Sequence, residues 1–169
     1  MEKILTIDTG VDVPKQEEIT PLNLYTDQHP MMKQVIPDYD LRTLPNPVMN
    51  KLVSRMTMTM KLYNGLGLSA NQCGVFERVF IMGSGDMVIT CINPKAIKVS
   101  EEVKKDREGC LSFPAMFLNI DRPEWVEAEF YDVNGQLHNV RFDGLTARCF
   151  LHELDHMNGI TMTQHVKDR

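Results

Sequence analysis

The chain has 169 residues, of which 43% are hydrophobic and 24% are charged, and its formal net charge at pH 7 is −5. A chain of this length can bury a substantial core, so we expect residues 1–169 to form a single domain. The negative net charge disfavours a protein that binds nucleic acid or an anionic membrane, and no apolar run reaches membrane-spanning length.

The N-terminal part of the chain contains few helix signals. The first eight residues, MEKILTID, lack the apolar core of a secretion signal and read as a strand. Without such a signal we expect reduced cysteines, with Cys73, Cys91 and Cys149 buried among apolar neighbours. Residues 17–47 carry five prolines, which predicts extended and turn structure with at most short helical pieces.

An amphipathic helix is predicted to begin at Asn46-Pro47, with Asn46 as its N-cap and Pro47 as its first helical residue. Apolar residues then recur at helical spacing and predict a buried stripe. The stripe consists of Val48, Leu52, Met56 and Met60, widened by Met49, Val53 and Tyr63.

Two β-hairpins and a second helix follow. The β-like runs 78–82 and 87–92 flank the turn segment 83–86. Residues 126–131 lead through Asn134-Gly135, a favoured two-residue turn, into a strand containing Val140 and Phe142. A helix is predicted from Leu145 to about residue 158, closed by Gly159. This order predicts an α+β fold, in which antiparallel sheets pack around a central helix in the C-terminal half and one amphipathic helix comes earlier.

The predicted second helix carries the pattern H-E-x-x-H over residues 152–156. Because four residues are about one helical turn, His152 and His156 project from one face and can hold one divalent metal. Glu153 can then take a proton from a water that the metal activates. A catalytic site of this kind usually takes three protein ligands, so a third must be found.

Downstream of the motif the third ligand is not evident. In the extended H-E-x-x-H-x-x-G-x-x-H pattern Gly159 falls in place, but Met162 occupies the third-ligand position. The acidic residue that follows is Asp168 at the terminus, and His165 lies in a C-terminal tail, where chains are commonly poorly ordered. The search therefore moves upstream.

Upstream, Cys110 follows a charged run and Gly109, a residue that lets the backbone approach closely. Beside an intact H-E-x-x-H, a Cys–His–His set with an open fourth position is favoured over a structural cysteine at a strand start. A third segment, GLGLSANQ at 65–72, has small residues that let a backbone line a narrow groove, and Gln72 offers an amide donor. Alone, this segment is equally typical of a tight turn between helix and strand.

Together the three segments resemble the signatures of the peptide deformylase family. The family signatures are G-x-G-L-A-A-x-Q, E-G-C-L-S and Q-H-E-x-D-H, and this chain has their counterparts in the same order at 65–72, 108–112 and 151–156. The resemblance extends from about residue 20 to 165. Two positions depart from the signatures, because Ser69 replaces an alanine and Leu151 replaces the glutamine before the first histidine.

The resemblance implies removal of the N-formyl group from formylmethionyl nascent chains, with release of formate. Cys110, His152 and His156 would hold one divalent metal, Fe(II) most often, with Zn, Ni or Co also accepted. Glu153 would act as general base on the activated water and then as the acid that protonates the leaving amine.

The resemblance also assigns the residues around the reacting group. The Gln72 amide and the Leu111 backbone N–H would stabilise the oxyanion. The substrate peptide would contact a set of residues on both sides of the metal, namely Gly65, Leu66, Gly67, Gly109 and Cys149. Arg148 is expected either to pair with Glu108 or to lie on the surface.

The implied partners are formylmethionyl nascent peptides, with no nucleic acid and no membrane. Many bacterial members continue into a long C-terminal helix that docks on the ribosome, whereas this chain stops about nine residues after Ile160. It therefore resembles short organellar or virus-encoded members, and ribosome docking is left open. We expect a cytoplasmic location, in the host cytoplasm or an organelle if the source is viral or organellar.

Two other functions compete with this interpretation. A peptidase or other amidase could use the same metal site on unformylated peptides. A structural metal site, or a module that only captures formylated N-termini, would be favoured if His165 joined the three ligands as a fourth.

Overall fold

The computed structural model describes residues 19–167. The strand expected within the first eight residues lies outside the described residues. Residues 19–46 run in extended segments with two short 3₁₀ helices, η1 (Pro30–Lys33) and η2 (Leu41–Thr43), as the prolines predict.

Helix α1 (Pro47–Leu62) begins at the predicted residue. The Asn46 side chain accepts a hydrogen bond from the Met49 backbone N–H at 2.8 Å, which satisfies one of the free donors of the first turn. The predicted stripe is wrong at its ends, because Val48 is 79% exposed and Tyr63 is 49% exposed. A repeat of four residues drifts by about 40° per step around a helix, so Val48 points well away from the face that Met60 buries.

Five strands form an antiparallel sheet with the order β1-β2-β3-β6-β7. Their bounds are β1 (Gly67–Ser69), β2 (Val79–Ser84), β3 (Met87–Val99), β6 (Trp125–Tyr131) and β7 (Leu137–Asp143). Both predicted hairpins are confirmed, as β2–β3 and β6–β7. Strand β1 lies at one edge of this sheet.

The β6–β7 turn is longer than the predicted two residues. Tyr131 pairs with Leu137, which leaves residues 132–136 as the loop. The Asp132 carboxylate accepts hydrogen bonds from the backbone N–H groups of Asn134 and Gln136, each at 2.9 Å. An aspartate that caps its own turn in this way stabilises the wider loop.

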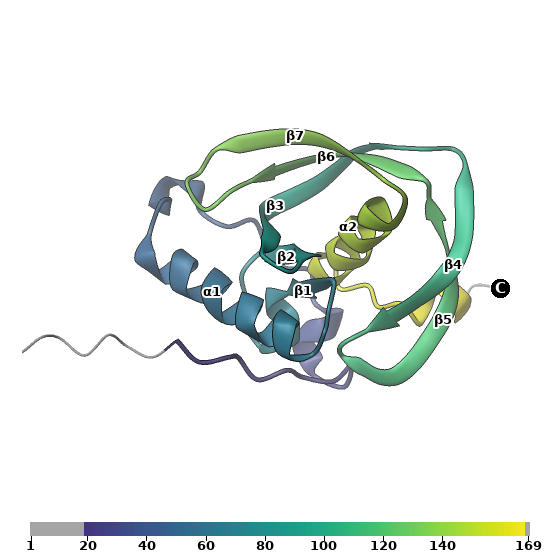
Figure 1. Ribbon diagram of the computed structural model, residues 1–169, viewed down its shortest axis with the longest axis horizontal. Coiled ribbons are helices and arrows are strands. Elements are labelled where there is room, and N and C mark those ends of the chain that lie inside the picture. Colours follow the sequence, from purple (N-terminus) through teal and green to yellow (C-terminus); the bar gives the residue numbers. More distant parts are fainter. Residues whose placement is uncertain (1–18, 168–169) are drawn as a thin grey trace, which may run out of the picture.

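A second sheet consists of β4 (Val103–Cys110) and β5 (Phe113–Pro123), and we call this pair the β4–β5 arm. Strand β3 runs beyond its predicted end at Ile92 through an irregularity at Asn93 and Pro94. Strand β3 leads into β4, and β5 leads into β6. Because β3 pairs with β6 and β4 pairs with β5, the four strands form one long hairpin. The hairpin is bent where the Ser100 hydroxyl accepts a hydrogen bond from the Glu124 N–H at 2.7 Å. Figure 1 shows the arm curving down one side of helix α2.

Helix α2 (Gly144–Met157) lies between the five-stranded sheet and the arm (Figure 1), and nine of its fourteen residues are buried. Phe150 packs against Phe80 and Phe142, with ring centroids 5.3 and 5.5 Å away. The predicted α+β arrangement of antiparallel sheets around this helix is confirmed. The described chain ends in the short helix α3 (Gln164–Lys167), and none of the described helices is long and apolar enough to cross a membrane.

Candidate active site

Helix α2 supplies two imidazoles and a carboxylate to the interior of the molecule. His152 and His156 lie one turn apart with ring centroids 5.0 Å from one another, and both are buried. Gly159 closes the helix with a φ of +70°, and a Cβ there would lie 2.8 Å from the Lys33 carbonyl carbon. The glycine therefore lets the chain turn tightly beside the N-terminal segment and holds this end of the helix in place.

The tip of the β4–β5 arm brings Cys110 to the two histidines. Its Sγ lies 3.3 Å from His156 Nε2, and the ligand atoms of Cys110, His152 and His156 all lie within 4.8 Å of one another. Atoms bonded at about 2.0–2.3 Å to one tetrahedral ion lie roughly 3.5 Å apart, so this donor set fits a single divalent metal. Within residues 19–167 it is the only such group of three His, Cys, Asp or Glu side chains.

His165 does not join these three side chains. Its Nε2 lies 2.7 Å from Oδ2 of Asp155, the residue that precedes the ligand His156 in the sequence. Met162, at the position of the third ligand in the extended motif, is buried against Phe113 and Ile120. The described residues therefore offer three ligands, as a site with an open position requires.

Glu108 orients the His152 ring by contacting its Nδ1. Its carboxylate lies 3.1 Å from His152 Nδ1, which leaves Nε2 of that ring to face Cys110. Arg122 donates to the same carboxylate through Nε at 2.9 Å and Nη2 at 3.1 Å, and Arg148 donates at 2.7 Å. Of the two alternatives for Arg148, the structure shows the pairing with Glu108, whereas Arg122 carried no signal in the sequence.

The ionisation of these groups follows from their contacts. Burial opposes the charge of Glu108, but hydrogen bonds with His152 and Arg122 outweigh it and lower the pKa of this carboxyl to about 2. Burial likewise opposes a charged His152, yet its contacts with Cys110 and Glu108 raise its pKa to about 10. Burial and the neighbouring His152 hold the pKa of His156 well below its ordinary value.

Glu153 lies on the other side of the site, against strand β1. Its side chain is buried, and this burial raises the pKa of the carboxyl. A Cβ at Gly67 would lie 2.8 Å from both Cγ and Cδ of Glu153, so only glycine leaves room for the carboxylate there. The Ser69 hydroxyl donates a 2.6 Å hydrogen bond to Glu153 Oε2.

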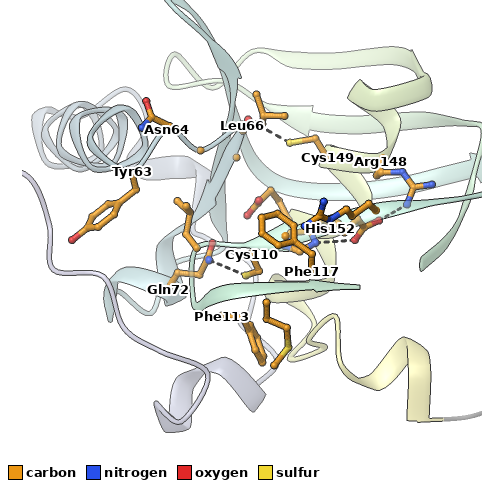
Figure 2. A pocket seen from close by; sticks show the side chains of 18 of the residues that line it. Tyr63, Asn64, Leu66, Gln72, Cys110, Phe113, Phe117, Arg148, Cys149 and His152 are labelled. Atoms are coloured by element: carbon orange, nitrogen blue, oxygen red, sulfur yellow. Dashed lines mark hydrogen bonds and ion pairs between the residues drawn. The ribbon is translucent and has the colours of Figure 1, made fainter. Parts of the chain in front are cut away.

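Gln72 reaches the site from the 3₁₀ helix η3 (Ala70–Cys73). Its side-chain nitrogen lies 3.5 Å from Cys110 Sγ and 3.1 Å from the Ser112 hydroxyl, while its Oε1 accepts from the Ser69 backbone N–H at 2.9 Å. Figure 2 shows this amide directed at Cys110. Segment 65–72 therefore contains strand β1 and most of η3 rather than only a tight turn between helix and strand, and it places a donor at the site.

A cavity of about 500 Å³ opens onto these groups (Figure 2). Its lining includes every residue predicted to contact a substrate, namely Gly65, Leu66, Gly67, Gly109 and Cys149, together with Leu111. Cys73 and Cys91 are buried as predicted, whereas Cys149 is only partly buried because it faces this cavity. The sequence did not single out the apolar walls, which include Tyr63, Phe113, Met116, Phe117 and Leu145.

Known proteins share both the sequence pattern and this fold. The family model described as polypeptide deformylase matches residues 21–169. The peptide deformylase of Thermotoga neapolitana is 36% identical over 79% of this chain and 85% of its own length, and peptide deformylase 1 of Pseudomonas syringae is 40% identical over 73% and 79%.

Solved structures agree with these matches. The crystal structure of the Thermotoga maritima peptide deformylase superposes with a TM-score of 0.82 at 29% identity, over 86% of this chain and 97% of that one. The Met-Ala-Ser bound peptide deformylase of Acinetobacter baumannii superposes with a TM-score of 0.84 at 26% identity, over 88% of this chain and 100% of that one.

Proposed function

The chain belongs to the polypeptide deformylase family, and on that premise we propose that it is a metal-dependent hydrolase that removes the N-formyl group from formylmethionyl nascent peptides in the cytoplasm and releases formate. The observation that carries the proposal is the convergence of Cys110, His152 and His156 beside the buried Glu153 in one cavity. Three ligands with a neighbouring carboxylate are the components of a hydrolytic metal site.

The donor set suits a single divalent metal ion. One divalent ion held by the Cys110 thiolate and the two imidazoles would polarise the formyl carbonyl and make a water acidic enough to react near neutral pH. A thiolate with two imidazoles suits Fe(II), Zn, Ni or Co, and from the family resemblance we propose Fe(II) as the native ion. Glu108 would keep the His152 ring turned toward that ion.

Glu153 carries the proton. Its raised pKa suits a group that accepts a proton from the attacking water and then returns it to the leaving amine nitrogen. Both transfers need the carboxylate to face the cavity, and Glu153 is among the residues that line it.

The negative charge that develops on the formyl oxygen needs hydrogen-bond donors. The Gln72 side-chain nitrogen lies beside Cys110, and the Leu111 backbone N–H follows Cys110 directly at the tip of the arm. We assign both donors to the oxyanion, because donors that are already in place lower the barrier without reorganisation.

The peptide would bind along strand β1. This strand is at the edge of its sheet, so the side of it that faces away from β2 can pair with an extended peptide as an added strand. Leu66, Leu145 and Cys149 offer an apolar wall for the methionine side chain. The Met-Ala-Ser peptide bound to the Acinetobacter baumannii relative supports a ligand of this class.

Substitution of the general base tests the proposal. We expect Glu153→Gln to lower the release of formate from formyl-Met-Ala-Ser by about 10²–10⁴-fold, because the proton acceptor is lost, while the bound metal measured in the same sample is unchanged. Glu127→Gln on the exposed side of β6 is the matched control and should retain full turnover. Near wild-type turnover in Glu153→Gln would show that this residue is not the base.

A further inference from the structure

Ser69 is the last residue of strand β1, and its hydroxyl points at the carboxylate assigned to proton transfer. The side chain is fully buried, and its Oγ lies 2.6 Å from Glu153 Oε2 and 3.2 Å from the Glu153 carbonyl oxygen. A hydroxyl has a single proton to donate. The carboxylate oxygen Oε2 is both the nearer and the stronger of the two acceptors, so it receives this hydrogen bond. The alanine of the family signature at this position could not make this bond.

The same residue contacts the oxyanion donor through its backbone. The Ser69 N–H donates to Gln72 Oε1 at 2.9 Å, so the amide nitrogen of Gln72 is left to face Cys110. Replacement of the serine by alanine keeps this backbone bond and removes the hydroxyl, which contacts Glu153 and also faces the Gln72 backbone N–H in the capping box of η3. The effect on Glu153 is therefore separated from the effect on Gln72 by making the substitution both with and without Glu153.

The Glu153 side chain is confined on its other side by Gly67, whose position leaves no room for a Cβ. This wall lies against Oε1 as well as the methylene groups, because Oε1 is the atom nearest to a Cβ at Gly67, and the other side of the carboxylate needs its own contact to fix the rotation of this broad torsion. The 2.6 Å bond from Ser69 engages Oε2 and thereby fixes that rotation. The other oxygen, Oε1, is left to receive a proton.

We propose that Ser69 is a positioning residue for the deformylation reaction, because its hydroxyl locks the carboxylate of Glu153 in the orientation that proton transfer requires. The inference rests on the proposed function and adds a residue to it. It concerns the chemical step alone, since Ser69 does not line the cavity in which the peptide would bind. Its loss should therefore change kcat and leave KM as it is.

The test compares Ser69→Ala in two backgrounds with formyl-Met-Ala-Ser as substrate. In the wild-type background we expect kcat to fall about 10-fold with KM and bound metal unchanged, since orientation of a reacting group is worth factors of this order. In the Glu153→Gln background the same substitution should have no further effect, because a residue that acts through Glu153 has nothing left to orient.

Thr59→Val is the control for the loss of a buried hydroxyl, since Thr59 is fully buried in α1 and bonds the backbone of Leu22. It should leave kcat unchanged. Should Ser69→Ala fail to fold, Ser69→Cys is measured instead, because it keeps the size of the side chain with a much weaker donor. An unchanged kcat, a rise in KM alone, or an equal loss in both backgrounds would overturn the inference. A wild-type protein that releases no formate would instead overturn the proposed function.

Discussion

Two glycines of the cavity face different groups, and their substitution separates chemistry from binding. A methyl group at Gly67 would overlap Glu153, so we expect Gly67→Ala to displace the carboxylate and lower kcat by about 10²-fold. Neither glycine has a positive φ, so the effect comes from space alone. Steady-state kinetics with formyl-Met-Ala-Ser measures it.

Gly109→Ala is the matched comparison. Its added methyl would lie 2.7 Å from the ring of Phe117, a half-exposed side chain over which the Arg107 guanidinium stacks at 4.1 Å. The ring lines the cavity and can move, so KM should rise while kcat stays close to that of the wild type. The explanation fails if both variants change the same kinetic constant.

At this scale the sequence predicted the residues whose chemistry depends on type and spacing. The H-E-x-x-H spacing places His152 and His156 on one helix face whatever the rest of the fold does. The bond from Ser69 to Glu153 could not be predicted, because it joins residues 84 positions apart and depends on how β1 packs against α2. The signature shows only that Ser69 stands where the family has an alanine, and the packing shows its hydroxyl on the carboxylate.

Among the elements, β4, β5 and α2 meet at one buried cluster of charges. Glu108 on β4 accepts from Arg122 on β5 and from Arg148 on α2, and it also contacts the ligand His152. We expect Glu108→Gln to lower the free energy of unfolding by about 3–5 kcal/mol, because the buried Arg148 loses its carboxylate partner and the buried Arg122 is left with Asp155 alone. Metal affinity should also fall, by about 10–100-fold, since the partner of a ligand histidine is weakened.

Urea denaturation and a competition assay with a metal chelator measure these two effects. Asp40→Asn is the control, because Asp40 pairs with Arg42 on the exposed surface and its loss should leave the urea midpoint unchanged. If Glu108→Gln matched this control in both assays, the cluster would have no role in holding the arm against the helix.

The elements themselves were predictable where a local signal marks them. The Asn46-Pro47 pair marks the start of α1, and alternating apolar runs mark the two hairpins of the main sheet. Strand β4 was missed because its residues 104–107 are all charged and exposed on an arm with little core of its own. Alternation predicts a strand only when one of its faces is buried along its length.

At the scale of the whole molecule, the site forms because the bent hairpin places the β4–β5 arm beside α2. The arm places Cys110 beside histidines more than forty residues later, and β1 places Gly67 and Ser69 on the opposite side of the same helix. The α+β class could be predicted from the order of elements. The path of the arm could not, since its bend depends on contacts between Ser100 and residues 124–125 that carry no pattern in the sequence.

The most direct test is anaerobic hydrolysis of formyl-Met-Ala-Ser with the metal content of the same sample determined. We predict that formate and Met-Ala-Ser appear in equal amounts, that chelation abolishes the reaction, and that added Fe(II) restores it. Unformylated Met-Ala-Ser should remain intact. Cleavage of a peptide bond without release of formate, or release of formate that is indifferent to chelation, would contradict a metal-dependent deformylase.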